Sequence, residues 1–288
     1  MSQRRIANIV TTPPPAPGFV GEGHLAVLVV SPDEFTGNDP FILLADDRLD
    51  LPAGRPAGGP HPHAGFETVT FMLEGSIHDR DEGVLEAGDV QWMTAGRGII
   101  HGESMVPHGH TRLLQLWLTL PRSQRAAAPG FRNIRRDSVP VRREAGVEVR
   151  VYAGSLGDHR APANPYVPVT LADIRLAPHA TLEQDLPSSY NGFLYVLDGS
   201  IRAGTDEAPI EAGQVGWLDR PQSTGSSTLR IAGGASGARL VLYAGEPQGD
   251  PLTLHGPFVA DSREDIVRLY REYREGRFQR LSETGVSA

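Results

Sequence analysis

The sequence contains no cysteine among its 288 residues. Disulfide bonds, thiolate metal ligands and cysteine nucleophiles are therefore excluded, and any metal must be bound by imidazole or carboxylate groups. The chain also lacks a run of about 18 apolar residues, the length that a membrane-spanning helix needs. Its first residues lack the apolar core of a signal peptide. We therefore expect a cytoplasmic protein that does not bind membranes.

An excess of positive charge is missing as well. The chain has 27 Lys and Arg against 35 Asp and Glu, which gives a net charge of −8. A protein that binds nucleic acid through its phosphates is normally basic, so no direct nucleic-acid binding is expected. The chain is rich in glycine (33) and proline (24) but has no low-complexity run. This composition favours many tight turns between short strands.

Short apolar runs alternate with turn-forming residues along the chain. The runs are rich in Val, Leu, Phe, Tyr and Trp, and Gly, Pro, Asp and Asn separate them. This pattern is typical of an all-β sandwich or barrel. The expected strands are 24–30, 66–73, 90–93, 113–120, 147–154, 169–176, 193–199 and 229–232.

The chain contains two copies of one short pattern. LEGSI at 73–77 returns as LDGSI at 197–201, and LEAGDVQWM at 85–93 returns as IEAGQVGWL at 210–218. The spacing between the two elements is nearly equal in both copies. Two copies of one strand–turn–strand plan predict two related β-barrels in tandem.

We place the two domains at 1–134 and 135–288, with 125–140 as the expected linker region. A short amphipathic helix is expected at the end of the second domain. Ser262 resembles a helix N-cap, and Gly276 is a suitable C-terminal stop. The apolar residues of this segment recur at helical spacing. They are Ile266, Leu269, Tyr270 and Tyr273.

Two residue pairs in the first copy indicate a metal site. A His-Pro-His sequence places His61 and His63 two residues apart, and a later His-Gly-Glu sequence does the same for His101 and Glu103. Residues i and i+2 of a strand point to the same face, so each pair can direct two ligands into one barrel. Three imidazoles and a carboxylate suit Fe, Mn, Ni, Cu or Zn. In an octahedral ion, two positions remain for substrate or dioxygen.

The second copy has no comparable ligand set. Sliding the sequence by about 124–125 residues brings other residue types onto the four candidate positions. In order, they are Asp185, Pro187, Ser226 and Thr228. We therefore expect one divalent metal per chain, in the first barrel.

Another His-x-His sequence, at His108 and His110, is weaker evidence. Its proline and glycine neighbours predict an exposed turn rather than a ligand pair.

The sequences GGPHPHAGFETVTFMLEGSI and GDVQWMTAGRGIIHGE, with the tail HGPFVADSREDIVRLYREYREGRF, resemble the pirin family. The resemblance covers nearly the whole chain. It implies two jelly-roll-like cupin barrels, of which the first binds iron and the second is degenerate. The ligand motifs of the family fall here on His61, His63, His101 and Glu103. Fe(II) is the implied ion, and Mn, Ni, Cu, Zn or Co are alternatives for the same ligands. The connection at 76–88 is shorter than usual for the family, which affects the expected substrate preference.

Five further residues are candidates for positions beside the metal or in a pocket. Glu67 is expected either to hydrogen-bond a ligand imidazole or to be a solvated strand residue. Gln91 and Met93 lie on a strand that could line a pocket, although core packing is the alternative for Met93. Gln115 lies in an apolar strand and needs a partner if it is buried, so it either orients a ligand or is structural. Arg97 belongs to a tight turn and could contact an anionic or phenolic ligand.

The resemblance implies a quercetin 2,3-dioxygenase-type enzyme, which cleaves a flavonol ring and inserts both atoms of dioxygen. The bound metal would lower the pKa of the flavonol 3-hydroxyl group, and Glu103 is the best-placed carboxylate to accept its proton. The first alternative is a regulatory protein whose iron acts as a redox-sensitive switch. Its partners would be transcription factors or metabolic enzymes. The second alternative is another cupin enzyme with a different small substrate.

Overall fold

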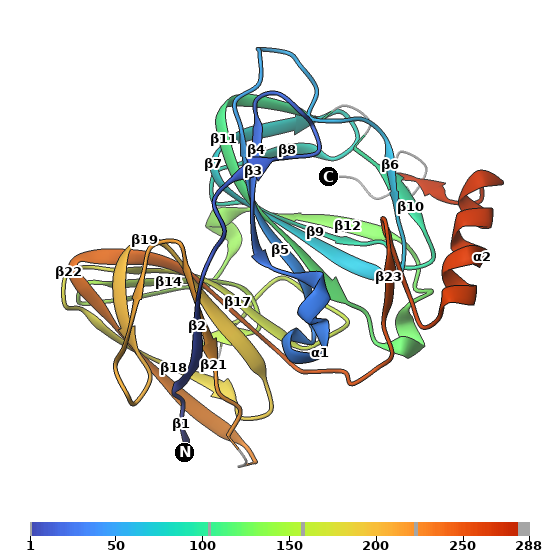
Figure 1. The fold of residues 1–288 in the computed structure, drawn as a ribbon. Helices are drawn as coiled ribbons and strands as arrows, with labels where there is room; N and C mark the ends of the chain where they lie inside the picture. The colour runs from blue at the N-terminus through green and yellow to red at the C-terminus, as the bar shows by residue number, and fades with distance from the viewer. Residues whose placement is uncertain (1, 103–104, 157–158, 222–223, 282–288) are drawn as a thin grey trace. The chain divides into compact units, whose positions relative to one another are not determined.

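The computed structural model describes residues 2–102, 105–156, 159–221 and 224–281. The chain divides into two compact units that consist mainly of antiparallel strands (Figure 1). The all-β fold class that the sequence predicts is therefore confirmed. The first barrel, as we call it, takes its described residues from 14–35, 41–137 and 248–288. The second barrel takes them from 1–13, 36–40 and 138–247.

The first barrel contains β3 (Ala16–Pro17), β4 (His24–Val30), β5 (Phe41–Leu49), β6 (His61–His63), β7 (Phe66–Asp79), β8 (Gly83–Glu86), β9 (Val90–Thr94), β10 (Ile99–His101), β11 (Val106–Thr119), β12 (Gly130–Ile134), β23 (Thr253–His255), β24 (Phe258–Ala260), α2 (Arg263–Arg274) and β25 (Gln279–Arg280). Its large sheet has the order β12-β9-β7-β11-β5-β4-β3, with β8 paired to β7. A smaller sheet has the order β25-β10-β6. Among the short helices, η1 (Pro32–Glu34) and η2 (Arg122–Gln124) belong to the first barrel, whereas α1 (Phe35–Asn38) and η3 (Arg136–Ser138) span positions where the chain passes from one unit to the other.

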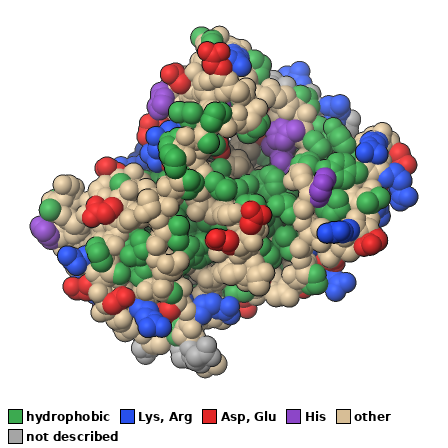
Figure 2. All heavy atoms as spheres, viewed as in Figure 1, with side chains coloured by type: hydrophobic (Ala, Val, Ile, Leu, Met, Phe, Trp, Pro, Cys, Tyr) green, Lys and Arg blue, Asp and Glu red, His purple; other side chains and the backbone are tan. Residues whose placement is uncertain are grey.

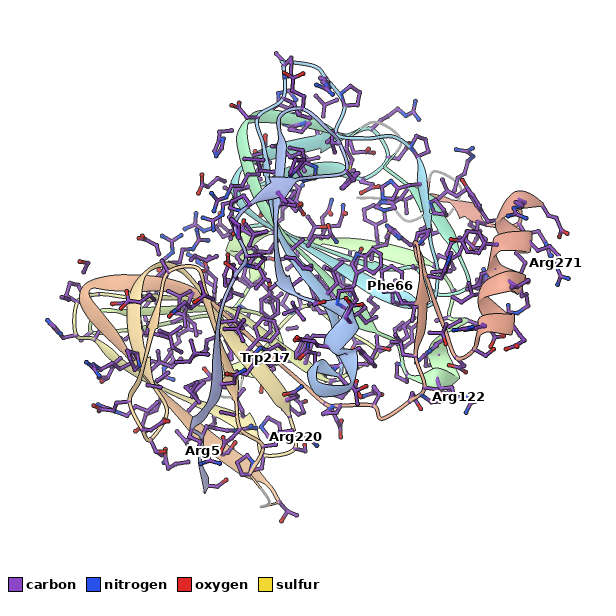
Figure 3. The ribbon with its side chains drawn as sticks, in the orientation of Figure 1. Arg5, Phe66, Arg122, Trp217, Arg220 and Arg271 are labelled. Atoms are coloured by element: carbon purple, nitrogen blue, oxygen red, sulfur yellow. The ribbon has the colours of Figure 1, made fainter. Side chains whose placement is uncertain are left out.

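The second barrel contains β1 (Ser2–Gln3), β2 (Ile6–Thr11), β13 (Val141–Glu144), β14 (Val147–Ala153), β15 (Ser155–Leu156), β16 (His159–Arg160), β17 (Val169–Leu176), β18 (Thr181–Pro187), β19 (Asn191–Ala203), β20 (Ala208–Glu211), β21 (Gln214–Leu218) and β22 (Ser226–Gly245). Its sheet has the order β13-β14-β17-β22-β19-β21-β2, and β1, β18 and β20 pair beside this path. Its interior is filled by a continuous cluster of buried aliphatic side chains. Trp217, labelled in Figure 3, packs its ring 4.7 Å from that of Phe193.

No single position in the sequence divides the chain into the two units, because each unit takes residues from three separate segments. The segment 1–13 joins the second barrel, where β2 pairs antiparallel with β21. The segment 248–288 joins the first barrel and contributes α2 and β25. This differs from the division after residue 134 that the repeat suggests. Strand pairing and burial decide which unit a terminal segment joins, and the repeat carries no information about either.

The apolar runs identified in the sequence all form strands, and several strands are longer than expected. β7 and β11 pair antiparallel over much of their length, with Gln115 opposite Thr70 and Trp117 opposite Thr68. Two segments differ from expectation. β5 was not predicted, because Asp46 and Asp47 interrupt its apolar run. The expected linker at 125–140 contains β12, which pairs with β9 and is part of the first barrel.

The predicted C-terminal helix is present as α2. The Ser262 hydroxyl accepts a hydrogen bond from the Asp265 amide, which satisfies one of the free N–H groups of the first turn. Ile266 and Leu269 are buried and pack with Phe258 of β24. Arg122, labelled in Figure 3, donates a hydrogen bond to Asp261 just before the helix. Across the described residues, neither the length nor the hydropathy of any helix suffices for a membrane crossing.

Candidate metal centre

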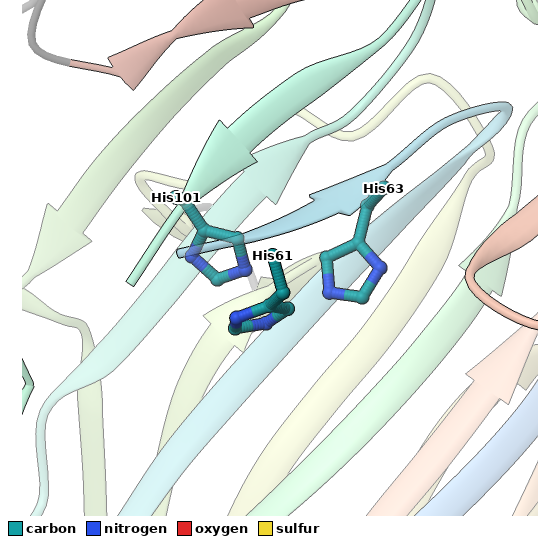
Figure 4. A group of neighbouring side chains, drawn as sticks. All are labelled: His61, His63 and His101. Carbon is teal, nitrogen blue, oxygen red and sulfur yellow. The ribbon is translucent and has the colours of Figure 1, made fainter. Parts of the chain in front are cut away.

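Three of the four candidate ligands lie together in the first barrel. His61 and His63 occupy the two ends of β6, and His101 ends β10. The antiparallel pairing of these strands places His61 directly opposite His101. One ligand nitrogen of each histidine lies within 4.8 Å of those of the other two, and Figure 4 shows the three rings side by side. The fourth candidate, Glu103, lies outside the described residues.

The hydrogen bonds of these imidazoles leave nitrogen atoms available for a metal. His61 Nδ1 lies 2.9 Å from the Gly59 carbonyl oxygen, to which it donates. His101 Nδ1 lies 2.9 Å from Glu82 Oε1. His101 Nε2 and His63 Nδ1 are buried and make no hydrogen bond within the described part of the chain. Buried polar atoms without a partner are rare and costly, and a bound cation would satisfy them. The residues therefore fit a divalent transition metal, for which imidazole is a suitable ligand.

Glu82 orients His101. It lies in the turn between β7 and β8 and is only 4% exposed. Its Oε1 atom accepts hydrogen bonds from His101 Nδ1 and from the Gly102 amide, both at 2.9 Å. Gly102 reaches this position with a φ of 76°, which glycine adopts without strain. A carboxylate bonded to one nitrogen of an imidazole directs the other nitrogen toward the metal and makes it a better ligand.

The environment of the site favours the neutral form of His61 and His63 and the charged form of Glu82. Burial lowers the pKa of His61, and the Coulombic interaction with the neighbouring His101 adds to this effect. Burial lowers the pKa of His63 well below its ordinary value, again with contributions from the other two histidines. Burial acts to raise the pKa of Glu82, but the hydrogen bonds and charge of His101 and the Gly102 amide outweigh it, so that this pKa is lowered. Neutral imidazoles are the form that binds metals.

The three histidines border a cavity of about 680 Å³ in the first barrel. Much of its lining is apolar and includes Leu43, Leu49 and Leu113, and Trp117 contributes an aromatic ring. The volume falls within the range of about 300–1,000 Å³ that is typical of small-molecule sites. On the face shown in Figure 2, histidine side chains lie beside a hollow bordered by hydrophobic side chains. The ring of His63 packs against Trp117 and against the fully buried Phe66, which Figure 3 labels.

Two of the candidate pocket residues line this cavity. Gln91 is 9% exposed, donates a hydrogen bond to Asn133 and is also bonded to the Glu82 side chain. Gln91 therefore helps to fix Glu82, which in turn orients His101. Gln115 is half-buried, and its amide oxygen accepts a hydrogen bond from Thr70 at 2.9 Å. This bond leaves the amide N–H groups of Gln115 available to a ligand.

The other three candidates lie elsewhere. Glu67 is buried and accepts a hydrogen bond from Thr94 at 2.8 Å; a contact with a ligand imidazole stays a prediction. Met93 is fully buried in an apolar cluster with Phe131 and does not line the cavity, because its neighbours fill the surrounding space. Arg97 is exposed, and its guanidinium donates a hydrogen bond to Gln279 instead of reaching the cavity.

His108 and His110 are exposed, as predicted, although they lie in β11 near a register shift rather than in a turn. Sequence reasoning missed several polar residues of the cavity wall, among them His24, Asp47 and Glu82. Asp47 had a recognisable signal, because it is a charged residue within an apolar strand. Glu82 had none, because carboxylates in turns are usually solvated.

The second barrel has no imidazole at the corresponding positions. β18 pairs with β22 so that Asp185 lies opposite Thr228, as His61 lies opposite His101. The strand register therefore puts Thr228 at the position of His101, where the sequence alignment put Ser226. Thr228 donates a hydrogen bond to Asp185 at 2.8 Å, so the two side chains satisfy each other.

Comparisons with known proteins agree with this architecture. The family models for pirin and for the pirin C-terminal cupin domain match residues 30–118 and 171–279. Pirin-like protein 2 of Arabidopsis thaliana is 36% identical over 265 residues, which cover 89% of this chain and 81% of that protein. A Pseudomonas aeruginosa protein provisionally named as a quercetin 2,3-dioxygenase is 38% identical over 258 residues, which cover 85% of this chain and 88% of that protein. The crystal structure of a quercetin 2,3-dioxygenase from Acinetobacter baumannii is 26% identical, with a TM-score of 0.83 over 96% of this chain and 99% of that one. The chain therefore belongs to the pirin family.

Proposed function

We propose that this protein is a metal-dependent dioxygenase of the quercetin 2,3-dioxygenase type, which opens the ring of a flavonol-like substrate. One observation carries the proposal. Imidazole nitrogens that are buried and unbonded in the described residues border a largely apolar cavity of small-molecule size. The similarity to proteins that bear the quercetin 2,3-dioxygenase name supports this choice of substrate.

The residues present would hold one divalent ion through His61, His63 and His101. We propose Fe(II) as the native ion, on the basis of the family resemblance. A bound ion would supply Lewis acidity to a substrate hydroxyl group and access to dioxygen chemistry. Glu103 is proposed from the sequence as a further ligand and as the group that accepts the hydroxyl proton.

The remaining residues of the site bind and orient. The apolar walls exclude water and receive the rings of an aromatic substrate. Glu82 keeps His101 in one orientation, so that the ligand geometry exists before binding. Gln115, fixed by Thr70, offers N–H donors to an oxygen atom of the substrate.

Turnover of a flavonol tests the proposal directly. Protein purified without oxygen and reconstituted with Fe(II) is mixed with quercetin and isotopically labelled dioxygen. We expect one dioxygen consumed per flavonol lost, and both labelled atoms in the ring-opened product. The His101→Ala variant, prepared in the same way, serves as the control for free iron. Fully metal-loaded protein that leaves quercetin intact would contradict the proposal and would favour a regulatory role.

A further inference from the structure

A buried histidine–aspartate pair forms part of the cavity wall in the first barrel. His24 begins β4 and Asp47 lies on β5, so the pair belongs to the large sheet and the ligand histidines to the smaller one. The two residues are 3% and 9% exposed, and His24 Nε2 lies 2.8 Å from Asp47 Oδ1. The Val20 amide donates to His24 Nδ1 at 3.2 Å. With Nδ1 accepting, the proton of the neutral ring lies on Nε2 and is donated to Asp47.

The histidine ring is held tightly in this orientation. A Cβ atom added at Gly18 would come within 2.3 Å of the His24 ring, so the backbone there packs directly on the imidazole. Phe19 contacts the ring from another side, with centroids 5.2 Å apart and the planes nearly perpendicular. Both nitrogen atoms of His24 are used, so it is not itself available to a ligand. Its role is to position Asp47.

Asp47 has acceptor capacity that the described protein does not use. Its Oδ1 atom is bonded to His24, which is its one hydrogen-bond partner among the described residues, and 13% of the side chain remains exposed. The residue lines the same cavity as the ligand histidines and lies next to apolar Leu49 and Leu113. A carboxylate in such a wall is costly unless it receives a donor. The missing donor is therefore to be sought in the ligand.

The fold does not require this polar pair, as the second barrel shows. Arg112 bonds Asp46 in the first barrel, and Arg239 bonds Asp173 in the same way in the second. These two ion pairs align the strands β5 and β17. The residue that follows Asp173 is Ile174, so Ile174 corresponds to Asp47.

Strand pairing identifies the counterpart of His24. His24 lies opposite Leu49 in the first barrel, and Val147 lies opposite the corresponding Leu176 in the second. Val147 and Ile174 are both buried in the apolar core of the second barrel. An apolar pair therefore satisfies the architecture at these positions, and the polar pair needs another explanation.

We propose that Asp47, positioned by His24, accepts a hydrogen bond from a substrate hydroxyl group other than the one at the metal centre. The inference rests on the proposed function in that the substrate is taken to be aromatic and bound at the three imidazoles. A carboxylate accepts from hydroxyl groups and repels anions. The cavity thereby selects polyhydroxylated aromatic compounds over analogues with a single hydroxyl or with a carboxylate at this position.

Binding measurements test this without any turnover. Protein loaded with Zn(II), which is not redox-active, is titrated with quercetin and with 3-hydroxyflavone, which keeps only the 3-hydroxyl. In Asp47→Asn we expect quercetin to bind about 10- to 100-fold more weakly, the size of one hydrogen bond to a charged acceptor. The affinity for 3-hydroxyflavone should change less than about twofold. Asp50→Asn, an exposed aspartate just beyond the end of β5, is the matched control and should affect neither ligand.

A second variant covers the case in which Asp47→Asn folds poorly. The double variant His24→Val with Asp47→Ile carries the residue types of the second barrel at both positions. Replacing a buried polar pair by well-packed apolar residues is often neutral or stabilising, so we expect an unfolding temperature at least equal to that of the wild type. Its quercetin affinity should fall and its 3-hydroxyflavone affinity should not.

The outcomes separate this inference from the proposed function. Selective loss of quercetin binding without turnover of quercetin by the Fe(II) protein supports the role of Asp47 and contradicts the dioxygenase. Normal turnover with equal affinity changes for both ligands, or with none, overturns the role of Asp47 and leaves the dioxygenase intact.

Discussion

Glu82 and His101 lie 2.9 Å apart between Oε1 and Nδ1, and both are buried. The bond joins the turn after β7 to the end of β10, so the orientation of a candidate ligand depends on a residue 19 positions earlier in the chain. Glu82 Oε1 also accepts from the Gly102 amide, which ties the carboxylate to the backbone next to the ligand.

Removing the charge of Glu82 should weaken metal binding. In Glu82→Gln an amide replaces the carboxylate at His101 Nδ1, so the imidazole becomes a poorer ligand. We expect the metal affinity to fall by about 10- to 100-fold, the usual effect of changing such a partner. Competition with a chromogenic chelator measures it. Glu86→Gln, an exposed glutamate on β8, is the control. Equal affinity in Glu82→Gln and the wild type would show that this bond does not tune the ligand.

The candidate ligand histidines should be distinguishable from the exposed pair on β11. His61→Ala or His101→Ala should remove most of the metal affinity, because no other described histidine is placed to replace the lost nitrogen. His108→Ala and His110→Ala should leave it nearly unchanged, since both side chains are exposed. Isothermal titration with the metal makes the comparison. The site would be misplaced if the His108 and His110 variants lost binding while the other two kept it.

One metal ion should bind per chain. In the second barrel, Asp185 and Thr228 lie where the first barrel has His61 and His101, and they are bonded to each other. Elemental analysis of fully reconstituted protein should therefore give about one tightly bound ion. A value of about two would mean that the second barrel also holds a metal.

The metal-free protein should lose stability in mild acid. The pKa values of His61 and His63 are lowered in the folded state, so below the ordinary histidine pKa of about 6.5 the unfolded chain binds more protons. The free energy of unfolding should therefore fall as the pH drops below this value. Glu82 adds to the loss only below its ordinary pKa of 4.5. Urea unfolding of chelator-treated protein at pH 7.5 and 5.5 measures the change.

The control for this effect is His63→Leu, which replaces the more deeply buried imidazole by an apolar side chain. Its stability should depend less on pH across the same interval. An unchanged pH dependence in this variant would assign the acid sensitivity to other groups.

Glu103 has the most demanding role that the sequence proposes. In Glu103→Gln a coordinating oxygen remains but the basicity is lost. Metal content should fall modestly, while flavonol cleavage per bound iron should fall by about 10²–10⁴-fold, the contribution of a positioned general base. Activity and iron content are measured on the same preparation. Full activity per iron would remove the proton-accepting role.

The sequence by itself determined the class of fold and pointed to the three histidines as candidate ligands. Alternating apolar runs specify strands because side chains of a strand alternate between two faces. The same period places His61 and His63 on one side of β6, so their proximity follows from local geometry. The repeat indicated two barrels, and Ser262 marked the start of α2, because both signals lie within a few neighbouring residues.

Only the tertiary structure decided which distant residues support the site. Glu82 and His24 are ordinary turn and strand residues in the sequence, and their roles depend on partners that strand pairing brings beside them. Asp47 interrupts an apolar run, so the sequence did not predict β5. In the folded barrel, the Asp47 carboxylate is accommodated by its hydrogen bond to His24. The N-terminal segment joins the second barrel because β2 pairs with β21, and the C-terminal segment joins the first barrel because β25 pairs with β10. These contacts join residues far apart along the chain, so no local pattern could encode them.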